Sequence, residues 1–154
     1  MDFTTILSSD AVKILTSASS KKRLMQDIGE LVSQAYNLKS EDVVEALITR
    51  ESLGPTGVGH GVALPHARLD GLERVVGAFV LLDKPIDFDS VDRLPVDLAF
   101  ALFAPADAGV EHLKALALVS RTLRDTSIRT KLRANPDAGT LYTILTEEKV
   151  VQAA

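Results

Sequence analysis

The chain has 154 residues, a net charge of −4 and 46% hydrophobic residues, which is typical of one compact globular domain. Its acidic balance argues against general nucleic-acid binding, because such binding depends on Lys and Arg side chains that neutralise phosphates. The lack of cysteine excludes disulfides, thiol catalysis and thiolate metal sites. We therefore expect residues 1–154 to form a single domain with no nucleic-acid partner.

The sequence contains no sign of export or membrane insertion. Residues 1–13 lack the basic start and long apolar stretch of a secretory signal. The longest apolar runs, Val75–Leu82 and Leu98–Ala106, are far shorter than the ~20 residues needed to cross a bilayer. We expect a cytoplasmic protein that does not insert into membranes.

The first part of the chain is predicted to contain one strand and two helices. Val12–Leu15 is short and apolar, which predicts a strand. Ser20 is a candidate N-cap for a helix that continues to about Tyr36. A second helix is predicted from Ser40 to about Arg50, just before a group of glycines.

Three strands are predicted next, at Val62–Leu64, Val75–Leu82 and Val96–Phe103. The last two are nearly all apolar, as expected of strands that are covered on both faces of a sheet. These strands are separated by prolines, which favour turns and strand ends.

The last part of the chain is predicted to be helical. A helix begins at Val110, and one of its faces carries an apolar set: Leu113, Leu116, Ala117, Ser120 and Leu123. A short helix is predicted at Ser127–Arg133. A final one is predicted at Ala138–Glu147, with Leu141, Ile144 and Leu145 facing inward. This order of elements suggests a mixed sheet between layers of helices.

The most informative segment is residues 50–68, RESLGPTGVGHGVALPHAR. Its four glycines and two prolines lead to His66. Glycine permits backbone shapes that other residues resist, and proline fixes φ. We interpret the segment as a shaped loop that holds His66 in a set place.

Three other kinds of site are poorly supported. The G-x-G-x-G run at residues 57–61 lacks the glycine that the dinucleotide fingerprint needs at Val62, and no Gly-Lys-Ser/Thr is present. No G-x-S-x-G hydrolase motif occurs. The three histidines are not spaced as metal ligands: His60, His66 and His112. We expect no cofactor and no metal.

His66 remains as a nucleophile that accepts a charged group. Imidazole has an unperturbed pKa of ~6.5, so much of it is neutral at pH 7. Backbone N–H groups of the glycine-rich segment could surround a phosphoryl group, and Arg50 offers a planar guanidinium for its oxygens. His112 opens a helix and could reach the same place. The alternatives are that Arg50 is a solvated residue at a helix end and that His112 bonds to nearby backbone.

The chain resembles the enzyme IIA domain of the mannitol/fructose class of the bacterial phosphotransferase system. The resemblance covers nearly the whole chain and is carried by five segments: Arg50-Glu51, Thr56–His66, Pro95–Leu98, Pro105-Ala106 and His112-Leu113. The ending, with Leu132–Ala134 and Leu141–Leu145, is similar to the nitrogen-regulatory branch of that family. We expect no fused transporter or IIB domain, which would fit that branch.

This resemblance implies a three-layer α/β/α sandwich around a mixed sheet. It also implies that His66 accepts a phosphoryl group from an HPr-like phosphocarrier protein, with Arg50 and His112 lining the site. The phosphorylated protein would then control a regulated protein target. Two alternatives remain open: a sugar-transport enzyme IIA that passes the group to a IIB protein, and a purely regulatory binding module.

The chain departs from the family pattern at several positions. His60 stands where Asn is common and is expected to border the site without being phosphorylated. Pro55 replaces a small polar residue. Ala67 and Arg68 replace Gly-Lys, so Ala67 would be strained if its φ had to be positive, whereas Arg68 keeps the positive charge.

Overall fold

The computed structural model describes the backbone of residues 1–153 and the side chains of residues 1–147. In chain order its elements are α1 (Phe3–Ile6), β1 (Leu7–Leu15), α2 (Lys21–Tyr36), α3 (Ser40–Glu51), β2 (Gly57–Gly59), β3 (Val62–Ala63), β4 (His66–Leu69), β5 (Val76–Ile86), β6 (Val96–Pro105), α4 (Val110–Arg124), α5 (Thr126–Ala134) and α6 (Ala138–Ala153). None of the described helices is both long and apolar enough to cross a membrane.

The strands form one six-stranded sheet in the order β1-β5-β6-β3-β2, and β4 also pairs with β6. β5 is antiparallel to β6, whereas β1 runs parallel to β5. β3 and β4 both run parallel to β6 and follow each other along its length, because Val62 lies opposite Leu98 and His66 lies opposite Leu102. The predicted mixed sheet is therefore confirmed.

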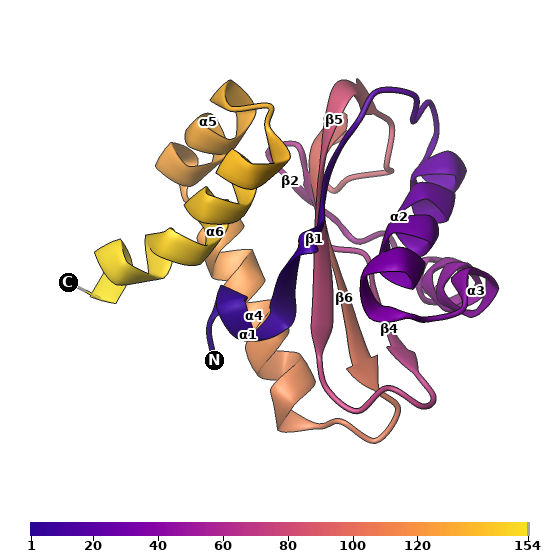
Figure 1. Cartoon of the computed structure of the whole chain (residues 1–154). Helices are drawn as coiled ribbons and strands as arrows, with labels where there is room; N and C mark the ends of the chain where they lie inside the picture. Colours follow the sequence, from indigo (N-terminus) through magenta and orange to yellow (C-terminus); the bar gives the residue numbers. More distant parts are fainter. Residues whose placement is uncertain (154) are drawn as a thin grey trace.

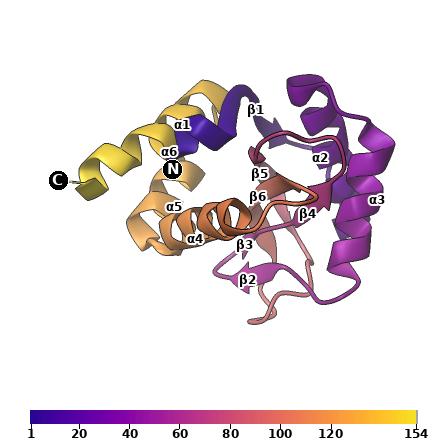
Figure 2. The ribbon, with the colours of Figure 1, turned by 90° about the horizontal axis from the view of Figure 1, so that it is seen from below.

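Helices cover both faces of this sheet (Figure 1). α2 and α3 lie on one face, and α1, α4, α5 and α6 lie on the other. The view from below, in Figure 2, shows the same two layers with the sheet between them. This arrangement is the three-layer α/β/α sandwich that the sequence led us to expect.

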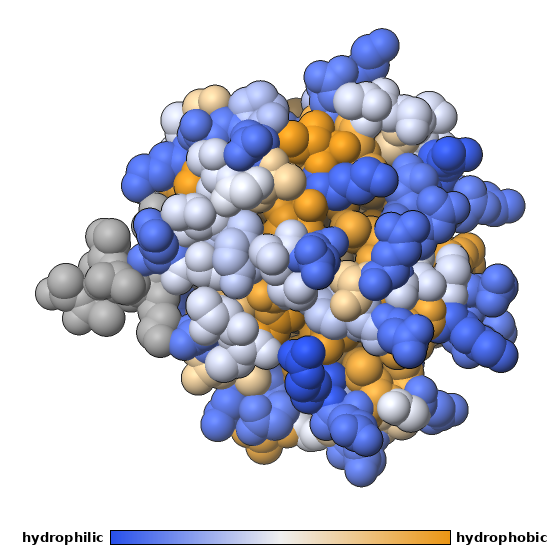
Figure 3. All heavy atoms as spheres, in the orientation of Figure 1, coloured by the Kyte–Doolittle hydropathy of each residue, from blue (hydrophilic) through white to orange (hydrophobic). Residues whose placement is uncertain are grey.

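The core lies at the central strands β5 and β6, most of whose residues are buried. Phe79 of β5 and Phe100 of β6 pack with their ring centroids 6.2 Å apart, and neither side chain is exposed. Continuous apolar strands of this kind are stable only when helices cover both faces. On the side of the molecule seen in Figure 3, hydrophobic residues show mainly in the middle, with hydrophilic residues over the helices on either side.

The two helices predicted in the first part of the chain are confirmed. The hydroxyl of Ser20 accepts a hydrogen bond from the backbone N–H of Arg23 at 3.1 Å, which caps α2. The strand predicted at Val12–Leu15 is the last part of the longer β1. The short helix α1 was not predicted, since four residues are too few to show helical spacing.

The glycine-rich segment is not simply a loop, so that prediction is partly wrong. β2 pairs antiparallel with β3 and forms a small hairpin on the edge of the sheet. A Cβ atom at Gly57 would collide with Ser90, and one at Gly61 would collide with the guanidinium of Arg133. These glycines therefore allow the hairpin to lie close to neighbouring segments.

The buried face of helix α4 matches the predicted one only in part, since Leu123 is buried and Leu116 packs partly against the core. Its buried residues are His112, Ala115, Val119, Thr122 and Leu123. Leu113 was expected to face inward but is 65% exposed. The inward position at the start of α4 is occupied by His112, which turns Leu113 toward solvent. In α6, Leu141 and Leu145 are buried as predicted, and Ile144 packs partly against the core.

Candidate functional site

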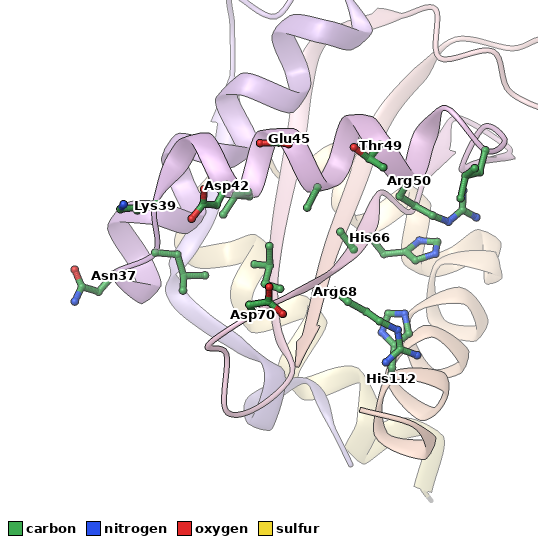
Figure 4. Close-up of a pocket in the computed structure, with 16 residues that line it drawn as sticks. Asn37, Lys39, Asp42, Glu45, Thr49, Arg50, His66, Arg68, Asp70 and His112 are labelled. Atoms are coloured by element: carbon green, nitrogen blue, oxygen red, sulfur yellow. The ribbon is translucent and has the colours of Figure 1, made fainter. Parts of the chain in front are cut away.

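A groove of about 800 Å³ lies between helix α3 and strand β4. At one end it is lined by Arg50 from α3, His66 and Arg68 from β4, and His112 from α4 (Figure 4). The other end extends to the turn between α2 and α3, near Lys39. The three predicted site residues are thus brought together from three different elements.

His66 is the first residue of β4. Strand β3 pairs with β6, and this pairing stops at Leu64 and Pro65. It resumes as β4 from His66 onward. The carbonyl of Pro65 accepts a hydrogen bond from the N–H of Leu102 at 3.0 Å. His66 is therefore held by the edge of the sheet, and not by a loop as predicted.

The imidazole of His66 has a defined orientation. Its Nδ1 lies 2.7 Å from the carbonyl oxygen of Leu64. A carbonyl oxygen can only accept, so Nδ1 carries the hydrogen and Nε2 of the neutral ring has a free lone pair. Burial lowers the pKa of His66, and this effect outweighs the bond to Leu64, which raises the pKa; the charge of Arg50 also lowers it. The ring is consequently a neutral nucleophile near pH 7.

His112 lies beside His66, with the ring centroids 5.7 Å apart. Its side chain is buried, and Nδ1 has no hydrogen-bond partner among the described residues. Burial lowers the pKa of His112, with smaller effects from His66 and Arg68, so this ring is also neutral near pH 7. A buried N–H without a partner is costly, which favours the tautomer with its hydrogen on Nε2.

Arg50 is at the end of α3 and its guanidinium has a fixed anchor. Nη1 donates a hydrogen bond to the carbonyl oxygen of Gly54 at 3.0 Å. A guanidinium has five N–H donors, so this anchor leaves others for a ligand. Arg50 lines the groove together with His66.

Arg68 also lines the groove, although the sequence analysis did not include it among the candidate site residues. It lies two residues after His66 on β4, and its guanidinium donates to the carbonyl oxygen of Ala108. Alternate residues of a strand share a face, so the spacing would have placed it beside His66 had β4 been predicted as a strand. Ala67 between them is buried in β4 without a positive φ, so the possible strain at this position does not arise.

His60 and the glycines of the hairpin do not line the groove. The N–H of His60 donates to a carboxylate oxygen of Asp92 at 2.9 Å, and its carbonyl accepts from Arg133 at 2.7 Å. The expectation that His60 borders the site is therefore wrong. We had expected the glycine N–H groups to surround the site at His66. They do not, because the backbone at residues 57–63 pairs within the hairpin.

The histidines do not form a metal centre in the described part of the chain. Among residues 1–147, no three His, Cys, Asp or Glu side chains are grouped so that they could hold a metal ion. The groove instead combines two guanidinium groups with two neutral imidazoles. Such a set can bind an anion and present a nitrogen nucleophile to it.

Comparisons with known proteins agree with this chemistry. The family model described as "Phosphoenolpyruvate-dependent sugar phosphotransferase system, EIIA 2" matches residues 5–148. A nitrogen regulatory protein from Bradyrhizobium diazoefficiens is 44% identical over 145 residues, which cover 94% of this chain and 95% of that protein. A fructose-specific EIIA component from Haloferax volcanii is 31% identical over 147 residues, which cover 95% of this chain and 96% of that protein. The crystal structure of nitrogen regulatory protein IIA-Ntr from Neisseria meningitidis matches with a TM-score of 0.84 and 38% identity, covering 92% of this chain and 97% of that one.

Proposed function

The chain belongs to the EIIA 2 family of the phosphoenolpyruvate-dependent sugar phosphotransferase system, and on this basis we propose that it accepts a phosphoryl group on Nε2 of His66. The observation that carries the proposal is the hydrogen bond between Nδ1 of His66 and the carbonyl oxygen of Leu64. It leaves Nε2 unprotonated in the neutral ring, and His66 lies next to two guanidinium groups in the groove. The donor would be an HPr-like phosphocarrier protein that itself carries a phosphohistidine.

The transfer requires no proton to leave His66. The lone pair of Nε2 attacks phosphorus, a new P–N bond forms, and the P–N bond of the donor breaks with its electron pair returning to the donor imidazole. Nδ1 keeps its hydrogen and its bond to Leu64 throughout. Because burial and Arg50 lower the pKa of His66, the nucleophilic form predominates near pH 7.

Arg50, His112 and Arg68 would stabilise the phosphoryl group during transfer. Phosphoryl transfer depends mainly on positioning and on stabilising the charge that is spread over three equatorial oxygens. The free N–H donors of the guanidinium groups suit two of these oxygens at once. The Nε2–H tautomer of His112 supplies a further neutral donor.

A protein partner is favoured by the apolar residues around the charged end of the groove. Leu53, which lines the groove, is 81% exposed, and Leu113, next to His112 in α4, is 65% exposed. Val110 at the start of α4 is 62% exposed. Apolar side chains around a charged centre are typical of an interface with another protein.

The output of phosphorylation is proposed to be regulation of a protein target. The relative from Bradyrhizobium diazoefficiens is a nitrogen regulatory protein, and the identity covers nearly all of both chains. Phosphoenolpyruvate, named in the family description, is a cytoplasmic metabolite, so a cytoplasmic location belongs to this proposal. A second candidate is transfer onward to a IIB protein of a sugar transporter, which the identity to a fructose-specific EIIA component favours. A purely regulatory module would bind its target without carrying the phosphoryl group.

The test is the intact mass of the protein after incubation with phosphoenolpyruvate, enzyme I and an HPr-like carrier. We expect one added phosphoryl group that is labile in acid and stable in base, and none on a His66→Ala variant. Transfer should survive treatment of the phosphorylated carrier and the acceptor with EDTA. Phosphate on His60 or His112, or none on the wild type, would refute the proposal. Incubating the phosphorylated protein with purified IIB proteins then separates regulation from sugar transport.

A further inference from the structure

We propose that Glu51 and Thr56 are positioning residues for phosphoryl transfer, because the hydrogen bonds that join them hold Arg50 on one side and His66 on the other. This inference rests on the proposed function. Neither residue lines the groove, so neither touches the phosphoryl group. Their effect is exerted through the two residues that do.

The carboxylate of Glu51 is fully engaged by its neighbours. One oxygen accepts the hydroxyl hydrogen of Thr56 at 2.6 Å, and the other accepts the N–H of Thr56 at 2.8 Å. The second oxygen also pairs with Nζ of Lys21 at 2.8 Å. The side chain of Glu51 is only 8% exposed and Thr56 is 5% exposed, so these charge-assisted bonds are shielded from water.

The first consequence is a closed turn that anchors Arg50. Glu51 and Thr56 bond across residues 52–55, and the N–H of Gly54 donates to the carbonyl oxygen of Glu51 at 3.1 Å. The carbonyl oxygen of Gly54, within this turn, accepts the hydrogen bond from the guanidinium of Arg50. A turn that opened would therefore release the anchor of Arg50.

The second consequence is a fixed acceptor for His66. The carbonyl oxygen of Thr56 accepts a hydrogen bond from the N–H of Leu64 at 2.9 Å. The carbonyl oxygen of Leu64 in turn accepts the hydrogen of His66 Nδ1. The tautomer of the nucleophile thus depends on a peptide segment that Thr56 holds in place.

Lys21 ties this network to the β5–β6 connection. Its ammonium lies 4.7 Å from the ring centroid of Phe88, and its Nζ lies 3.5 Å from a carboxylate oxygen of Asp89. The buried charge of Glu51 is therefore neutralised without a contact to the phosphoryl group. Glu51 also raises the pKa of His66, against the larger effect of burial, which places its charge within electrostatic reach of the nucleophile.

The test compares Thr56→Val, which keeps the shape of the side chain and removes its hydroxyl, with Thr56→Ser, which restores the hydroxyl. Thr140→Val is the matched control, because the hydroxyl and N–H of Thr140 bond to one carboxylate oxygen of Asp137 at 2.8 and 2.9 Å, and neither residue lines the groove. Three quantities are measured: single-turnover transfer from the phosphorylated carrier, the melting temperature, and the His66 tautomer by ¹H–¹⁵N NMR of the imidazole. Glu51→Gln is measured in the same way.

We expect Thr56→Val to slow transfer by about ten- to a hundredfold, because a small misplacement of reacting groups has an effect of this size. It should also populate the tautomer of His66 that carries its hydrogen on Nε2. Thr56→Ser should recover most of the rate, and Thr140→Val should transfer like the wild type even if it melts at a lower temperature. A wild-type rate and tautomer in Thr56→Val would overturn the inference. A wild type that accepts no phosphate would refute the proposed function, while the tautomer would still decide whether Thr56 positions His66.

Discussion

The rings of His66 and His112 lie 5.7 Å apart between centroids, although one belongs to strand β4 and the other to helix α4. Both rings are partly withdrawn from water, and burial lowers the pKa of each. Two neutral imidazoles can stay side by side without repulsion, whereas two imidazolium ions could not. One can therefore act as nucleophile while the other donates a hydrogen bond.

Replacing Arg50 by Ala is expected to slow transfer without destabilising the fold. Loss of a charge-assisted contact made in the transition state typically costs ~2.7–4 kcal/mol, or a hundred- to thousandfold in rate. Arg50→Lys should recover only part of the rate, since an ammonium cannot hold two oxygens at once. Single-turnover transfer and a thermal melt check this. Equal rates for the wild type and Arg50→Ala would mean that the guanidinium does not contact the phosphoryl group.

Replacing Arg68 by Gln should also slow transfer, by about tenfold or more, because it removes the second guanidinium of the groove. Lys84→Gln is the control, since it changes the net charge equally at an exposed position of β5 outside the groove. The measurement is the transfer rate of both variants at low and high salt. If the two variants slow equally, the effect is one of overall charge and not of the site.

The transfer rate should rise with pH and reach a plateau, with an apparent pKa below the usual 6.5 of histidine. The reason is that only neutral His66 has a lone pair on Nε2, and burial favours the neutral form. Single-turnover rates across pH, together with an NMR titration of His66, check this. Spontaneous hydrolysis of the phosphorylated donor is followed without acceptor as the control. A rate that falls as the pH rises through this range would contradict the assignment.

The same pKa shifts predict how stability depends on pH. His66 and His112 have lower pKa values in the folded chain than in the unfolded one, so the unfolded chain binds more protons as the pH falls. Their contribution to stability is therefore complete above about pH 6.5 and is lost as the pH falls through the folded pKa values. Between about pH 7.5 and about pH 5, the melting temperature of a double variant with His66→Gln and His112→Gln should fall by less than that of the wild type. Equal falls in melting temperature would argue against the lowered pKa values of the two histidines.

Leu113→Ser should weaken productive encounter with the donor and leave the fold intact. Leu113 is 65% exposed, so its replacement removes little core packing. We expect a higher donor concentration at half-maximal rate with a similar maximal rate. Steady-state transfer at varied carrier concentration measures both quantities, and a lower maximal rate alone would show that Leu113 acts on chemistry and not on docking.

Tyr36→Phe should destabilise the fold and spare the site. The hydroxyl of Tyr36 donates to the carbonyl oxygen of Gly77 at 2.6 Å and accepts from the N–H of Ser8 at 3.0 Å. Its loss removes a hydrogen-bond partner from two partly buried backbone groups, which costs about 1–3 kcal/mol. Denaturant unfolding measures this cost. Transfer by the folded variant should match the wild type, since Tyr36 does not line the groove.

Much of the secondary structure could be predicted from the sequence, and so could the choice of His66 as the candidate nucleophile. The apolar runs of β5 and β6 and the helical spacing of α2 are local patterns, so they indicate their elements without tertiary information. His66 could be singled out because a rare concentration of glycine and proline precedes it. Arg50 and His112 were candidates from the residues alone, and the resemblance to enzyme IIA domains implied that both line the site.

Only the tertiary structure decided how these residues meet. Pairing with β6 turns the end of the glycine-rich segment into strand β4, and this places Arg68 beside His66. The apolar spacing predicted only part of the buried face of α4, because a polar residue, His112, takes an inward position at the groove. The sequence by itself determined the local elements and the chemistry that is available. Hydrogen bonds between distant segments decided the geometry of the groove. Strand pairing and helix packing depend on contacts that no local pattern encodes.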